Sequence, residues 1–64
     1  MKIKEIMDSY SIEEKLRLRD EIVSELGICL STFYYKLKNG RWSVAQVKII
    51  AQILGCNVID LIDD

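Results

Sequence analysis

The stretch that decides the fold runs from Arg19 to Leu37 and reads RDEIVSELGICLSTFYYKL. Its apolar residues recur at helical spacing on both sides of one glycine, Gly27. Glycine adopts the left-handed backbone that ends a helix without the steric cost of a Cβ atom. Phe33 and Leu37, four residues apart, fall on one face of a second helix. The stretch therefore predicts a helix-turn-helix over about 19–38.

The rest of the chain predicts three further helical segments and no strand. Two segments begin at capping-box patterns, Ser11 with Glu14 and Ser43 with Gln46. The alternation over 16–19 leaves open a break in the second segment, although one continuous helix is the preferred interpretation. The expected segments are 1–9, 12–26, 30–38, 44–54 and 58–62.

Apolar spacing also predicts which side of each segment faces the core. For the second segment the expected inward positions are Ile12, Leu16, Arg19, Ile22 or Val23, and Leu26. For the fourth they are Val44, Val47, Ile50, Ala51 and Leu54. A chain of 64 residues with 50% apolar residues is expected to form one domain, 1–64, with a single core.

From Arg19 onward the chain resembles the Xre/Cro-like family of small phage and bacterial repressors. The resemblance is carried by Gly27, Ile28 and Phe33, and it continues through AQILGCNVIDLI at 51–62. It implies an all-α fold, a compact five-helix lambda-repressor-like DNA-binding domain. It also implies sequence-specific binding of double-stranded DNA by a transcriptional regulator, with the helix at about 30–38 reading an operator.

Three positions depart from the family's pattern. Val23 stands where a small alanine is usual, and Cys29 stands where a polar N-cap is expected. The later buried position of the second helix falls on Lys36 or, shifted by one, on Leu37, which is the preferred assignment. This shift implies a reading helix that is slightly longer or rotated.

The resemblance assigns base-reading roles to one turn of the motif and its neighbours. Ser31 can hydrogen-bond several bases, Leu30 can contact a thymine methyl group, and Lys36 can donate to guanine. Packing over the outer edge of the motif is the alternative for both tyrosines. The base-reading candidates are Leu30, Ser31, Tyr34, Tyr35 and Lys36.

Phosphate contacts are expected from the end of the reading helix, the following loop and the start of the next helix, whose dipole favours an anion. The candidates are Thr32, Lys38, Asn39, Arg41, Ser43 and Arg19. Three alternatives stay open: Thr32 caps its own helix, Arg17 and Arg19 pair with acidic residues of their own helix, and Trp42 packs instead of resting on the DNA backbone.

Charge is distributed unevenly along a chain whose formal net charge is only −1. The segment 36–48 holds four cations and no acidic residue, namely Lys36, Lys38, Arg41 and Lys48. A local basic segment can bind phosphates even on an acidic protein.

One module of this size covers only roughly 600 to 1,000 Å² of DNA, which is too little to select among many sites. A homodimer on a near-palindromic operator is therefore expected, with half-sites about 34 Å apart. Ile59 and Ile62 are the expected pairing surface.

Other classes of function receive less support from the composition. No apolar run reaches the ~20 residues of a membrane span and no signal-peptide pattern is present, so a cytoplasmic location is expected. With no histidine and no Cys-x-x-Cys spacing, Cys29 and Cys56 are expected to be reduced, and no metal, cofactor or small-molecule ligand is implied.

An enzyme is not expected, because no nucleophile has an evident base and no glycine-rich phosphate loop is present. The alternative function is a protein-interaction module, such as an antitoxin or anti-repressor, that uses the same fold. The outward face of 30–38 discriminates between the two. An apolar patch there favours a protein partner, and lysines with Arg41 and Ser31 on one convex surface favour DNA.

Overall fold

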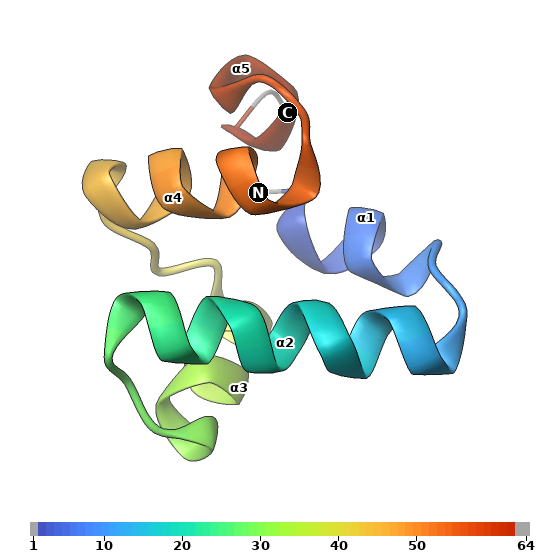
Figure 1. The fold of residues 1–64 in the computed structure, drawn as a ribbon. Coiled ribbons are helices and arrows are strands. Elements are labelled where there is room, and N and C mark those ends of the chain that lie inside the picture. The colour runs from blue at the N-terminus through green and yellow to red at the C-terminus, as the bar shows by residue number, and fades with distance from the viewer. Residues whose placement is uncertain (1, 63–64) are drawn as a thin grey trace.

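The computed structural model describes residues 2–62, which form five helices and no strand (Figure 1). The expected all-α class is therefore confirmed for this part of the chain. Helix α2 crosses the molecule as its longest element and packs chiefly against α4, while α4 also packs against α5 and α1 contacts α3. The helices are α1 (Ile3–Asp8), α2 (Ile12–Leu26), α3 (Leu30–Asn39), α4 (Val44–Leu54) and α5 (Val58–Ile62).

Helix α2 is continuous, as preferred from the sequence, and the alternation over 16–19 causes no break. It begins at Ser11, whose hydroxyl accepts a hydrogen bond from the Glu14 amide. It ends at Gly27, whose φ of 65° lies in the left-handed region. Helix α4 begins at a full capping box, because Ser43 and Gln46 each accept a hydrogen bond from the other's backbone.

The core collects apolar side chains from every helix and from the loop before α4. Its buried members are Ile3, Met7, Leu18, Ile22, Phe33, Trp42, Val47, Ile50, Ala51 and Leu61. The amide of Lys2 donates to the Leu61 carbonyl at 2.8 Å, which ties the start of α1 to α5. No helix among the described residues is long and apolar enough to cross a bilayer.

The inward face predicted for α2 was partly wrong. Ile12 and Leu16 are 75% and 44% exposed, whereas Leu18 and Ile22 are buried. Two apolar stripes compete on this helix, and the stripe that holds Leu18 and Ile22 is the one that joins the core. Arg19 is only half-buried. Packing into the core, which periodicity alone does not reveal, decides between the stripes.

The inward face predicted for α4 was right except at its first residue. Val47, Ile50 and Ala51 are buried and Leu54 packs at the edge of the core, but Val44 is 71% exposed. Val44 opens the helix, and α4 makes its first core contact one turn later, at Val47.

Candidate nucleic-acid interface

Three residues, 27–29, connect α2 to α3. The amide of Gly27 donates to the carbonyls of Val23 and Ser24, at 3.0 and 3.3 Å, and the Ile28 amide donates to Val23 at 3.3 Å. These bonds use the last carbonyls of α2 and fix the direction in which the chain leaves it. Ile28 packs against the core, so the connection is held from inside as well.

The outward face of α3 follows from its helical spacing. Phe33 is buried, and Leu37 is half-buried against the core, as preferred from the sequence. The positions turned away from Phe33 and Leu37 are exposed, namely Ser31, Tyr35, Lys38 and Asn39, and Leu30 and Tyr34 are exposed at the edges of this face. Four of the five base-reading candidates are therefore exposed, and two of them, Ser31 and Tyr35, share the outward face with Lys38 and Asn39.

Lys36, the fifth base-reading candidate, lies on the flank of α3 and not on its outward face. It is half-buried, and its ammonium group donates to the Arg41 carbonyl at 3.1 Å. The Arg41 amide in turn donates to the Lys36 carbonyl at 3.3 Å. Lys36 thus holds the loop after α3, and the Arg41 side chain extends from that loop into solvent.

The N-terminus of α3 carries a thiol in place of an ordinary cap. Cys29 occupies the N-cap position without a side-chain cap bond. Its sulfur lies 3.3 Å from the Ser31 hydroxyl and 3.2 Å from the Thr32 hydroxyl. These hydrogen bonds lower the pKa of Cys29 from 9.0 to about 7, and the bond with Ser31 has the largest effect. Thr32 therefore contacts the cap residue and does not replace it.

Arg19 links α2 to the outward face of α3. Its guanidinium donates to the Tyr34 hydroxyl at 3.0 Å and to the Asp20 carboxylate at 2.8 Å. The hydrogen bond with the Tyr34 hydroxyl and, to a smaller extent, that with Asp20 raise the pKa of Arg19. Arg17 donates to Glu14 at 2.6 Å. Pairing within α2, the alternative left open for both arginines, is the observed arrangement.

The two tyrosines differ in how they are held. The Tyr34 ring meets the buried Phe33 ring edge to face, with centroids 5.3 Å apart, in addition to its bond with Arg19. Tyr35 is 59% exposed. The Tyr35 carbonyl accepts a hydrogen bond from the Asn39 side chain at 2.8 Å. Tyr34 thus combines packing with exposure, and Tyr35 presents its side chain to solvent.

Apart from Lys2, the cations of the described chain fall into two groups. Those at positions 4–19 form ion pairs, in which Lys4 and Lys15 share Asp8, Arg17 pairs with Glu14 and Arg19 pairs with Asp20. Within residues 2–62, no carboxylate pairs with any cation of the segment 36–48. We call this segment, with Lys36, Lys38, Arg41 and Lys48, the basic segment.

One contribution to this surface was missed by the sequence analysis. A surface hollow of about 360 Å³ brings Lys4 and Glu5 of α1 beside Lys38, Asn39 and Gly40. The α1–α3 contact creates this juxtaposition, and no local pattern in the sequence signals it. Lys4 is therefore a further candidate for a phosphate contact, although it also pairs with Asp8 at 3.1 Å.

The loop after α3 is anchored by Trp42. This residue is 8% exposed, and its ring meets Phe33 edge to face at 5.9 Å. The indole N–H is buried and has no acceptor among the described residues. Trp42 therefore acts through the packing of its ring. At Ser43, the hydroxyl and the amide are both used in the capping box, and an anion at this helix start would meet other amides.

No protein-family model, characterised protein or solved structure matches the chain. Among the described residues, no group of three His, Cys, Asp or Glu side chains is placed to hold a metal ion. The functional assignment therefore rests on the geometry and charge described above.

Proposed function

We propose that this chain is a lambda-repressor-like helix-turn-helix domain that binds double-stranded DNA sequence-specifically and regulates transcription in the cytoplasm. In this proposal α2 and α3 are the two helices of the motif, and α3 enters the major groove. The observation that carries the proposal is the basic segment, whose cations lack carboxylate partners within residues 2–62 and in which Lys38 lies on the exposed face of α3 and Arg41 in the loop that follows it. Such cations are available to neutralise phosphates.

The outward face of α3 offers chemistry for reading bases. Ser31 and Tyr35 present hydroxyl groups, and Leu30 presents an aliphatic surface suited to a thymine methyl group. Lys38 and Arg41 extend beside this face and would bind the DNA backbone. Lys36 would act through the loop that it holds, because its ammonium group is directed to the Arg41 carbonyl.

A two-fold dimer would give the domain the footprint that one copy lacks. Val44, Ile59 and Ile62 are exposed, and an apolar surface groove of about 70 Å³ is lined by Val44 and Ile62 together with Trp42, Val47 and Val58. Pairing through this surface of α4 and α5 would bury apolar area on both copies. The half-sites would lie about 34 Å apart.

One observation favours the alternative, an interaction module of the antitoxin or anti-repressor type. Leu30 and Tyr34 are exposed one turn apart on α3, and Arg19 beside them is paired with Asp20. Lys36 is directed away from this face. An apolar patch with few free cations suits a protein surface. The basic segment favours DNA over this alternative.

Selection of random-sequence duplexes by the purified protein at about 150 mM salt tests the proposal. Enrichment of a short inverted repeat is expected. Tyr35→Ala should relax the preference at one base position, by about 1 to 3 kcal/mol, while Tyr35→Phe separates the hydroxyl from the ring. Absence of any enriched sequence, with affinity remaining at about 10⁻⁴ to 10⁻⁶ M, would favour the interaction module.

A further inference from the structure

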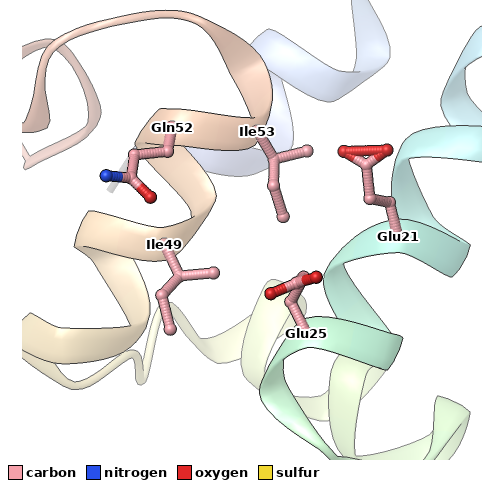
Figure 2. A pocket seen from close by; sticks show the side chains of 5 residues that line it. All are labelled: Glu21, Glu25, Ile49, Gln52 and Ile53. Atoms are coloured by element: carbon pink, nitrogen blue, oxygen red, sulfur yellow. The ribbon is translucent and has the colours of Figure 1, made fainter.

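A second surface lies between α2 and α4 (Figure 2). It is a groove of about 280 Å³. Figure 2 shows the carboxylates of Glu21 and Glu25 on the α2 side and the side chains of Ile49, Gln52 and Ile53 on the α4 side. Both isoleucines are only half-buried. The groove thus combines two acidic groups with exposed aliphatic surface.

The two carboxylates are unfavourably placed for the stability of α2. They lie four residues apart, where like charges repel along a helix. Glu25 also lies in the last turn, which contains no basic residue, so its charge opposes the helix dipole. Within residues 2–62 neither carboxylate has a cationic partner, and Arg17, one turn before Glu21, donates to Glu14 instead. A sequence that violates local rules in one place often does so at a functional site.

The groove is separate from the outward face of α3, although Lys48 of the basic segment lies one turn before Gln52 on α4. Glu21 lies two residues after Arg19, which contacts α3, and positions two apart on a helix are about 200° round its axis. The groove therefore opens on nearly the opposite side of α2 from that contact. A partner seated in it would leave the outward face of α3 free.

We propose that this groove docks a basic, apolar helical segment of a partner protein. Lysine or arginine side chains of the partner would pair with Glu21 and Glu25, and an aliphatic side chain would pack on Ile49 and Ile53. Charge complementarity selects this occupant. A second copy of the chain fits less well, because its basic segment spans a helix end, a loop and a helix start and does not form one basic helix face.

A designed peptide probes the groove in the absence of DNA, so the outcome is independent of the proposed function. The probe is a 14-residue amphipathic helix of leucine, alanine and arginine, and its counterpart carries glutamate in place of arginine. Titration is followed by amide chemical shifts of the labelled protein. The arginine peptide should shift the amides of the residues that line the groove, and the glutamate peptide should not.

Matched variants test the role of the carboxylates. Glu21→Gln and Glu25→Gln should each weaken binding about 3-fold, and the double variant about 10-fold, as expected for exposed ion pairs. Glu13→Gln makes the same charge change on α2 outside the groove and should leave the affinity within 1.5-fold, roughly the lower limit for such a pair. Equal effects of Glu13→Gln and Glu21→Gln would overturn the proposal, as would shifts confined to the outward face of α3.

Thermal melting separates docking from a structural role. Glu25→Gln removes the repulsion between the two carboxylates and should raise Tm by about 1 to 4 °C, while it weakens binding of the peptide. A lower Tm together with weaker binding would mean that the carboxylates support the fold, and it would overturn the proposal.

Discussion

The first two helices and the basic segment differ in whether their cations are paired with carboxylates. On α1 and α2, four cations are paired with carboxylates, three of them with a neighbour within four residues. The basic segment has no acidic residue of its own, and no carboxylate within residues 2–62 reaches its cations. The formal net charge of −1 therefore says little about the local field.

The difference has a structural origin. In the first two helices, Lys4 with Asp8 and Arg17 with Glu14 have spacings that bring side chains together on one helix face, while Lys15 reaches Asp8 from the next helix and Arg19 pairs with its neighbour Asp20. The basic segment spans a helix end, a loop and a helix start, so its cations diverge from regular helical spacing. Trp42, in the middle of the segment, holds the loop against Phe33 and leaves Arg41 exposed.

Removal of that anchor should have the largest effect. Trp42→Ala deletes a buried ring and should cost about 3 to 5 kcal/mol. Because a domain of this size has only about 3 to 5 kcal/mol of stability, the variant should be largely unfolded at 25 °C. Circular dichroism during thermal and urea unfolding would measure the loss.

Trp42→Phe is the control for the anchor. It retains an aromatic ring and removes an indole N–H that has no acceptor within residues 2–62, so its stability should stay within about 1.5 kcal/mol of the parent. DNA affinity should also stay near that of the parent, since the loop keeps its support. A folded Trp42→Ala variant with an unchanged Tm would contradict the anchoring role.

The second prediction contrasts a cation that lacks a carboxylate partner with a paired one. Arg41→Ala should weaken all DNA sites alike, by roughly 5-fold at 0.15 M salt, and reduce the salt slope by about 1, as for one lost phosphate contact. Arg17→Ala should change affinity much less, because Glu14 already neutralises Arg17. Fluorescence anisotropy across a salt series measures both. Equal losses would mean that pairing within α2 does not decide which cations reach DNA.

Local rules account for much of what could be predicted from the sequence. The capping serines and the glycine ends depend on residues within a few positions of each other. The exposure of Leu16 and the burial of Leu18 depend on how α2 packs into a core whose other members lie far along the chain. Periodicity permits both stripes, so the sequence alone could not decide between them.

The candidate site divides in the same way. Helical spacing correctly placed Leu37 inside. The direction of Lys36 depends on a loop carbonyl, and the position of Lys4 depends on the α1–α3 contact. Neither follows from a motif. Side chains whose partners come from loops or distant helices are thus the ones that sequence reasoning misplaced or missed.

The smallest expected effect comes from Cys29, because it adds at most one partial charge beside the basic segment. Its pKa of about 7 means that the thiolate fraction rises between pH 6 and 8. If α3 binds DNA as proposed, a negative charge at its start should lower affinity as pH rises, by about 2- to 5-fold, which is at most the effect of one phosphate contact. Cys29→Ser cannot ionise in this range and should abolish the dependence.

The same ionisation of Cys29 should raise the free energy of unfolding as pH rises, whereas it lowers DNA affinity. Folding lowers the pKa of Cys29 from 9.0, so the native state is stabilised at pH values above 9 and this stabilisation is lost as pH falls through about 7. Cys56 is an internal comparison, because burial and then Asp60 raise the pKa of its thiol. Iodoacetamide at pH 7 should therefore label Cys29 first, as peptide mapping would show. Faster labelling of Cys56 would contradict the hydrogen-bonded thiolate and, with it, the expected fall in DNA affinity.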